Sequence, residues 1–240
     1  MATLKQLREI FAPVLAEHPD LVLHRRWLFR PPIETAIIGL HIGRTSSASD
    51  SRMALSVLPL SRFREPSALG FYDIFEVERV IGVPPPNRLV SDGEEGPPRI
   101  FHDMFAPDYQ AHLLCNFNAK VPSFLDTVRT FDDVVAWLQP FREPSLRMEA
   151  IEFIDGWIAA MHGDFALAAD QLQIYFDRMG IIPDLKDSAE YRQQEAIRDV
   201  LRTGDRAAIA SCLHTMEERT IDAFGLQRFW RRAPFPFERA

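Results

Sequence analysis

The spacing of apolar residues changes partway along the chain, and this change constrains the fold more than any other feature of the sequence. Between residues 21 and 60 the apolar residues fall in short runs with an alternating pattern, which is clearest in Thr35–Gly43. From about residue 120 they recur every three or four positions, which is typical of amphipathic helices. The sequence therefore predicts an α+β fold: an N-terminal helix on a small antiparallel sheet, followed by an all-helical C-terminal part of antiparallel hairpins.

The first half is predicted to contain one helix and a short meander of strands. Apolar residues at helical spacing predict the helix over residues 3–17. Strands are predicted over residues 21–30, 35–43, 53–60 and 71–83, the last of which also fits a helix. Residues 83–98 contain five prolines, so we expect a long loop there, either a surface excursion or a flap over a site.

A glycine–aspartate pair occurs twice in the second half, as Gly163-Asp164 and, 41 residues later, as Gly204-Asp205. Glycine in the left-handed conformation ends a helix, and an aspartate side chain caps the start of the next one. Helices are therefore expected over residues 146–161, 165–179, 188–202 and 206–224. Thr130 and Asp133 have the spacing of a capping box, so a further helix should begin there.

These patterns divide the chain into three predicted parts. Residues 1–120 form the α+β sheet domain, residues 121–226 form the helical hairpin region, and residues 227–240 form an aromatic and basic tail. Because aromatic side chains are poorly solvated, we expect the tail to pack on the body of the protein. Pro234 and Pro236 argue against a helix within it.

Composition argues against several classes of protein. The 240 residues are 47% hydrophobic and 25% charged, as expected of a globular protein. The net charge of −7 argues against a nucleic-acid partner. The longest segment without Asp, Glu, Lys or Arg, residues 109–119, is much shorter than the roughly 20 residues that span a bilayer, so we expect no membrane association. Cys115 and Cys212 are too few for a disulfide framework, and we expect two buried thiols in a cytoplasmic protein.

Histidine and arginine side chains between residues 24 and 52 are candidates for a ligand-binding site. The segment Arg44–Arg52 places two arginines around a run of hydroxyl side chains, and such donors can bind a phosphate or a carboxylate. If the first two predicted strands present the same face, their histidines and arginines would gather beside that segment. The candidate ligand-binding residues are His24, Arg26, His41, Arg44, Ser46, Ser47 and Arg52. The alternative interpretation is a polar hairpin loop beside the solvent-facing side of a half-buried sheet.

The sequence contains no recognised catalytic motif, so no catalytic residue is assigned. Residue types that bind metals occur at His102, Asp103, Asp108 and His112, but their spacing fits no standard site. We therefore expect no metal and no cofactor. A solvated helix face is predicted for the carboxylates of Glu217, Glu218 and Asp222.

The order of several segments supports a comparison with known domains. These segments are Trp27–Arg30, Ile37–Ile42, Met53–Leu58 and Val121–Asp133, ahead of the helical hairpins. In this layout the chain resembles uncharacterised bacterial domains of unknown function, and its glycine–aspartate joints with nearby alanines are similar to tetratricopeptide-like hairpins. Some members of that broad group are thought to have immunity or accessory roles. The resemblance implies a binding role and carries over no catalytic residue.

Two hypotheses for the function remain open. The first is a non-catalytic, soluble binding or protein-interaction protein, whose partner is another protein or a second copy of the chain. The alternative is a sensor or enzyme for a small anionic molecule that uses the arginine and histidine cluster of residues 24–52. In an enzyme, His24 or His41 would be the acid–base candidate, because histidine titrates near neutral pH.

Overall fold

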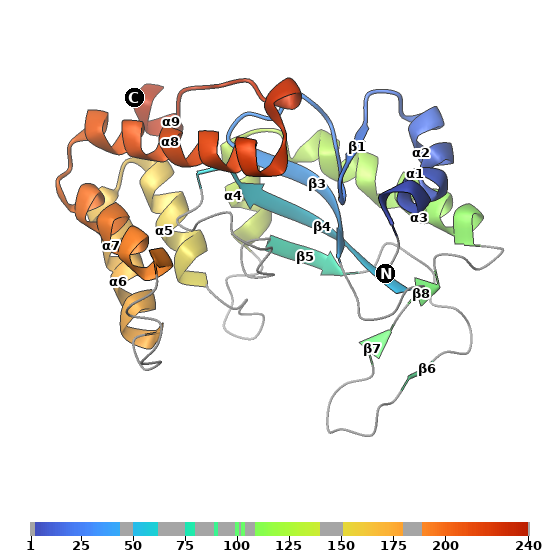
Figure 1. The fold of residues 1–240 in the computed structure, drawn as a ribbon, viewed down its shortest axis with the longest axis horizontal. Helices are drawn as coiled ribbons and strands as arrows, with labels where there is room; N and C mark the ends of the chain where they lie inside the picture. The colour runs from blue at the N-terminus through green and yellow to red at the C-terminus, as the bar shows by residue number, and fades with distance from the viewer. Residues whose placement is uncertain are drawn as a thin grey trace. The chain divides into compact units, whose positions relative to one another are not determined.

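A computed structural model describes residues 3–43, 50–61, 75–79, 89–90, 99–100, 102–103, 109–139, 151–179 and 189–239. These residues contain N-terminal helices, an antiparallel sheet and a helical C-terminal part, so the predicted α+β class is confirmed (Figure 1). The chain divides into two compact units. The sheet unit comprises residues 1–31, 38–57 and 76–129, and the helical unit comprises residues 32–37, 58–75 and 130–240.

The sheet unit begins with two short helices where the sequence predicted one. They are α1 (Leu4–Ile10) and α2 (Ala12–Glu17), and Thr3 caps the first of them through a capping box with Gln6. The chain bends at Phe11, two residues before Pro13, which occupies the first turn of α2, where its missing N–H costs no hydrogen bond.

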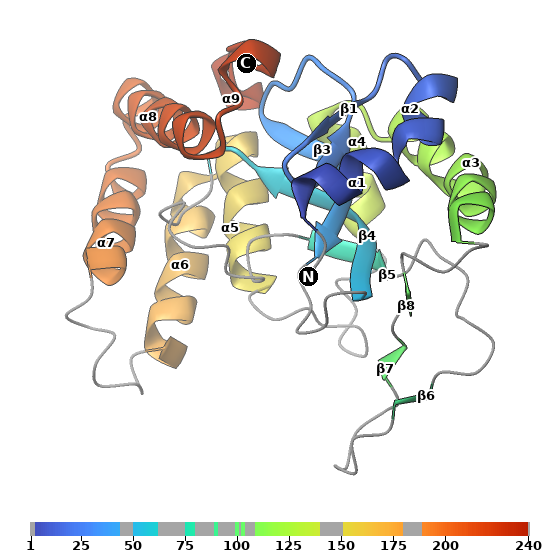
Figure 2. The same ribbon diagram turned by 45° about the vertical axis from the view of Figure 1, so that its right-hand side comes forward.

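A third helix in the sheet unit, α3 (Tyr109–Thr127), begins about ten residues before the helical pattern was expected to start. It packs against α2, and α1, α2 and α3 lie together in both ribbon views (Figures 1 and 2). The His18 Nε2 atom lies 2.8 Å from Asn118 Oδ1, which joins the end of α2 to the middle of α3. Cys115 lies on α3 and is exposed, so the expectation of a buried thiol is wrong there.

The main sheet has five strands in sequence order and one short additional strand. They are β1 (Val22–His24), β2 (Trp27–Phe29), β3 (Ala36–Gly43), β4 (Asp50–Pro59) and β5 (Phe75–Arg79), with β8 (His102–Asp103) paired to β4. A separate pair consists of β6 (Leu89–Val90) and β7 (Arg99–Ile100). The predicted strands over 35–43 and 53–60 are confirmed as β3 and β4, which form the centre of the sheet. The rest of the predicted loop over 83–98 lies outside the described residues.

The predicted strand over residues 21–30 is a tight hairpin instead. The chain reverses at Arg25 and Arg26, so that His24 pairs with Trp27. Arg25 has a φ of 53°, which a hairpin of this length requires but which non-glycine residues rarely adopt. The sequence does not indicate this reversal, because neither glycine nor asparagine marks it.

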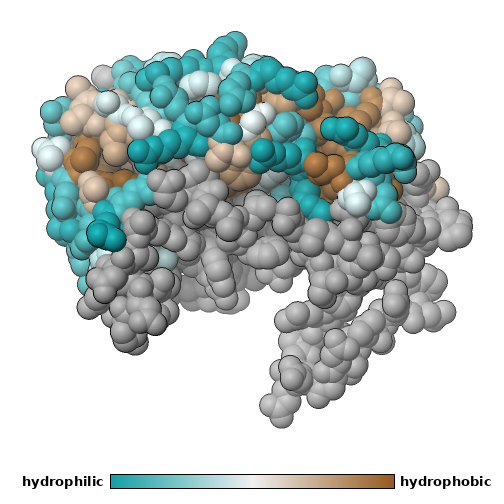
Figure 3. Space-filling view, in the orientation of Figure 1, coloured by the Kyte–Doolittle hydropathy of each residue, from teal (hydrophilic) through white to brown (hydrophobic). Residues whose placement is uncertain are grey.

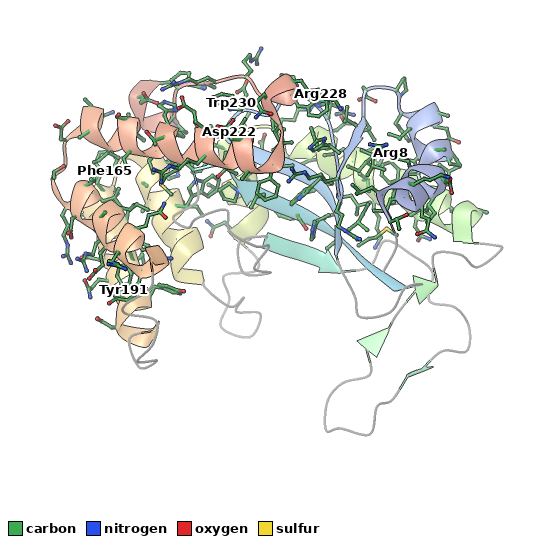
Figure 4. The ribbon with its side chains drawn as sticks, in the orientation of Figure 1. Arg8, Phe165, Tyr191, Asp222, Arg228 and Trp230 are labelled. Atoms are coloured by element: carbon green, nitrogen blue, oxygen red, sulfur yellow. The ribbon has the colours of Figure 1, made fainter. Side chains whose placement is uncertain are left out.

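The helical unit consists of α4 to α9. They are α4 (Phe131–Leu138), α5 (Ile151–His162), α6 (Phe165–Met179), α7 (Ala189–Arg202), α8 (Arg206–Phe224) and α9 (Pro236–Arg239). Helix α5 packs on α6, α6 on α7, and α7 on α8 (Figure 2). Figure 4 shows Phe165 and Tyr191, the early residues of α6 and α7, at opposite ends of this antiparallel pair. Pro234 and Pro236 were expected to exclude a helix from the tail, but one turn begins at Pro236, because proline is tolerated at the first helical position.

Both glycine–aspartate joints have the predicted geometry. Gly163 and Gly204 have φ values of 82° and 66°, in the left-handed region that glycine favours. Asp164 Oδ1 accepts a hydrogen bond from the backbone N–H of Leu167 at 3.1 Å. Asp205 Oδ1 accepts bonds from the two amides at 207 and 208, at 3.0 and 3.1 Å. Each joint therefore ends one helix and caps the next within two residues.

The described surface is polar over much of the face shown in Figure 3, with apolar patches between the hydrophilic side chains. Among the described residues, every helix is too short or too polar to cross a bilayer.

Candidate functional site

Three ring side chains form a row across the edge of the sheet. In the antiparallel register, His24 on β1 lies opposite Trp27 on β2, and Trp27 lies opposite His41 on β3. Residues that lie directly opposite each other in a sheet point to the same face. His24, Trp27 and His41 therefore share one face, and we call them the His24–Trp27–His41 row.

This row is a buried feature and not a solvated sheet face. Trp27 is 3% exposed and His41 is also buried, while His24 at the edge is half-buried. The rings of Trp27 and His41 have centroids 5.0 Å apart and are tilted by 39°. The structure thus brings together two of the predicted ligand-binding histidines, separated by an indole that was not among the candidates. Their ligand-binding role stays a prediction.

The indole nitrogen of Trp27 is the least satisfied atom of the row. It is buried and, within the described part of the chain, its N–H has no acceptor. An indole N–H can only donate, so the atom offers one vacant donor. A buried donor without a partner costs about 1–3 kcal/mol, and an acceptor oxygen placed there would recover that energy.

Arg26 lies at the same end of the sheet as the row. Its Nη1 atom is 3.4 Å from the carbonyl oxygens of Ile42 and Gly43, where β3 ends. Its own carbonyl accepts a hydrogen bond from the Ile42 amide at 2.8 Å, which fixes the hairpin turn against β3. The guanidinium of Arg26, the residue directly before Trp27, is therefore held at the end of β3.

The remaining predicted candidates cannot be placed with the row. Arg44, Ser46 and Ser47 lie outside the described residues. Arg52 belongs to β4, and its side chain also falls outside the description.

A second cluster of polar side chains, in the helical unit, was not predicted. His214 on α8 uses both ring nitrogens: Nδ1 lies 2.8 Å from Glu217 Oε2, and Nε2 lies 3.0 Å from Glu238 Oε2. Glu238 Oε2 also accepts a hydrogen bond from the Phe235 amide at 2.6 Å. The His214 ring stacks on Phe235 with centroids 4.3 Å apart. We call these three titratable side chains the Glu217–His214–Glu238 triad.

The interpretation of Glu217 as part of a solvated face is wrong. Glu217 is 1% exposed, and in the described structure its Oε1 atom has no hydrogen-bond partner. Burial raises the pKa of Glu217 from its ordinary 4.5 to about 8. Burial also lowers the pKa of His214. A sequence signal existed, because Glu217 is four residues from both Leu213 and Ile221 and so falls on the apolar stripe of α8.

A cavity of about 360 Å³ opens at the two glycine–aspartate joints of the helical unit. It is lined by Gly163, Asp164, Phe165, Ala166, Asp170, Leu201, Arg202 and Gly204. Two carboxylates and one guanidinium favour neither an anion nor a cation, so we assign no ligand to it.

The described residues include no group of three histidine, cysteine or acidic side chains arranged to hold a metal ion. Of the metal-like residue types noted in the sequence, Asp108 lies outside the described residues, and His102, Asp103 and His112 are described only as backbone within β8 and α3.

No family model matches this chain, and neither the curated proteins nor the solved structures compared with it show a match. The function is therefore argued from the geometry of the sites alone.

Proposed function

We propose that the protein is a non-catalytic binding protein, and that its sheet unit binds a small anionic molecule at the His24–Trp27–His41 row. The observation that carries this proposal is the buried Trp27 N–H, which has no acceptor among the residues that the structure describes. A carboxylate or phosphate oxygen supplies that acceptor, and a hydrogen bond to a charged group contributes about 1.5–3 kcal/mol.

The surroundings of Trp27 favour an anion over a neutral acceptor. The imidazoles of His24 and His41 flank the indole in the register of the sheet, and each can donate an N–H. The Arg26 guanidinium at the end of β3 adds a permanent positive charge. A short segment of sheet therefore carries a neutral donor, two titratable donors and a cation.

The spacing of the row favours binding over acid–base chemistry. His24 and His41 lie two strands apart, which is roughly 10 Å at the usual strand spacing. A general acid and a general base act on atoms within about 3 Å of each. At that separation the two imidazoles are too far apart to exchange a proton directly.

Calorimetric titration and thermal unfolding with inorganic phosphate, phosphate monoesters and small carboxylates test this proposal. A true ligand at 100 times its dissociation constant should raise the free energy of unfolding by about 2.7 kcal/mol. Trp27→Phe keeps an aromatic ring but removes the N–H, so we expect at least about tenfold weaker binding.

The matched control is Trp230→Phe, because the Trp230 indole already donates to the Glu34 carbonyl at 3.2 Å. It should bind as tightly as wild type. Unchanged melting curves across the whole set of anions would refute the proposal, and so would equal affinity of wild type and Trp27→Phe.

A protein-interaction role is the second candidate, and a separate observation favours it. Leu167 and Ile174 are 45% and 49% exposed, and their spacing of seven residues places them on one face of α6. Asp170 lies between them on the same stripe, so a partner segment with apolar and basic side chains would complement it. Co-purification from the native host should lose a specific partner when Leu167→Asn and Ile174→Asn are combined. A partner retained by that variant would count against this surface.

A further inference from the structure

The last residues of the chain are anchored in the helical unit by aromatic packing. We call residues 233–239 the C-terminal segment. Phe235 and Phe237 are fully buried, and the rings of Phe237 and of Phe165 on α6 are perpendicular, with centroids 5.1 Å apart. The short helix α9 also packs against α5. Arg206 at the start of α8 donates a hydrogen bond to the Phe237 carbonyl.

The polar anchor of this segment is the Glu217–His214–Glu238 triad, and it can form only with enough protons. Each nitrogen of His214 faces a carboxylate oxygen, so each of the two contacts needs a proton between nitrogen and oxygen. A neutral imidazole carries a single N–H. The second proton must therefore reside on one of the two carboxyl groups, or the ring must be an imidazolium; in each of these states the triad holds two protons.

The burial of Glu217 decides where these protons lie. An ionised carboxylate is costly in an apolar environment, so Glu217 is the acid that retains its proton. Glu217 Oε2–H then donates to Nδ1, and the ring donates its single Nε2–H to Glu238, whose side chain is partly exposed. Within the described part of the chain, the charged groups that act on the triad are Glu218 on α8 and Arg232 just before the C-terminal segment, and these two form an ion pair at 2.9 Å.

We propose that the C-terminal segment is a proton-controlled latch, closed while the Glu217–His214–Glu238 triad holds two protons and loosened when the triad loses one. After that loss the buried Glu217 carboxylate requires a donor, so the imidazole proton moves to Nδ1. The bare Nε2 lone pair then faces the Glu238 carboxylate at a distance where they repel. Glu238 turns to water, and the Phe235 amide loses its acceptor with it.

NMR of the full chain labelled with ¹³C and ¹⁵N in histidine tests the latch directly, because ring shifts distinguish the two neutral tautomers. We expect His214 to change from the Nε2–H to the Nδ1–H tautomer as the pH rises through the pKa of Glu217, about 8. Over the same range the rate of C-terminal trimming by a carboxypeptidase should rise about tenfold relative to Glu217→Gln at the same pH.

Glu217→Gln is the critical variant, because an uncharged amide N–H donates to Nδ1 at every pH. It should keep the Nε2–H tautomer and a protected segment throughout. Glu218→Gln changes the neighbouring exposed residue, whose charge raises the pKa of Glu217, so this variant should still change tautomer but at a somewhat lower pH than wild type. Glu238→Gln is a second test, since its amide oxygen still accepts from Nε2–H but carries no charge; trimming should then depend less on pH. A His214 tautomer that does not change in wild type would overturn the latch, as would Glu217→Gln releasing the segment in parallel with wild type.

Discussion

Two side chains show how much information a single buried polar atom can carry. Trp27 Nε1 and Glu217 Oε1 both lie in the interior, and among the described atoms neither finds a partner. Native proteins leave few such atoms, and each needs a physical explanation. For the Trp27 indole, we proposed that the oxygen of a bound ligand accepts the hydrogen bond. For Glu217, we proposed that the carboxyl group keeps its proton at neutral pH, and a neutral carboxyl group is much less costly to bury than a carboxylate.

The pH dependence of stability should reveal the Glu217 proton. The folded-state pKa of Glu217, about 8, lies above its unfolded value of 4.5, so between these limits the folded state binds more protons and stability falls as the pH rises. The lowered pKa of His214 acts in the opposite direction, but only below its unfolded value of 6.5. Between pH 6.5 and about 8 His214 therefore no longer offsets the Glu217 contribution, which approaches about 1.4 kcal/mol per pH unit.

Urea unfolding of wild type and Glu217→Gln at several pH values measures this contribution. Between pH 6.5 and about 8 the free energy of unfolding of wild type should fall by up to about 2 kcal/mol relative to that of the variant. Glu218→Gln, which changes an exposed carboxylate, should keep the wild-type slope. Parallel slopes for wild type and Glu217→Gln would show that Glu217 is already ionised at neutral pH.

At the scale of the elements, local chemistry accounts for what the sequence could predict. The glycine–aspartate joints were predictable because a left-handed glycine and a capping carboxylate act within four residues of each other. The β1–β2 hairpin was not predictable, because Arg25 supplies a positive φ without the residue types that usually indicate one. The start of α3 was also missed, and the proline at position 122 inside that helix weakens its local pattern.

The aspartate caps can be tested one at a time. Asp205→Ala removes the acceptor for two amides at the start of α8 and should lower the free energy of unfolding by about 1 kcal/mol. Asp199→Ala is the control, since this exposed side chain lies within α7 and pairs only with Arg198 in the described structure, so the change should stay within about 0.5 kcal/mol. Chemical denaturation measures the free energy of unfolding of both variants. An equal decrease in the two would show that the Asp205 cap does not stabilise α8.

Contacts between distant parts of the chain determine the rest of the structure, and no local pattern reports them. Ile33 pairs with the segment around Trp230: its amide donates to the Phe229 carbonyl, and its carbonyl accepts from the Arg231 amide, both at 2.9 Å. The contact of His214 with the C-terminal segment is of the same kind, because Phe235 and Glu238 lie more than twenty residues further along the chain. The candidate site also depends on such contacts. The sequence suggested that His24 and His41 could share a face, but only the strand register shows that the Trp27 indole lies between them.

Truncating one buried aromatic at the end of the chain should therefore act on the whole helical unit. Phe237 is fully buried and contacts Phe165, Phe235 and the start of α8, so Phe237→Ala should lower the free energy of unfolding by about 3–5 kcal/mol. Leu167→Ala shortens a surface side chain that is 45% exposed, and it should lower the free energy of unfolding much less, by about 0.5 kcal/mol. Urea unfolding followed by circular dichroism at 222 nm reports helix content and compares the two variants. If Phe237→Ala were no more destabilising than Leu167→Ala, the C-terminal segment would not be part of the folded core. The latch proposal, which requires this segment to be packed on the helical unit, would then fail.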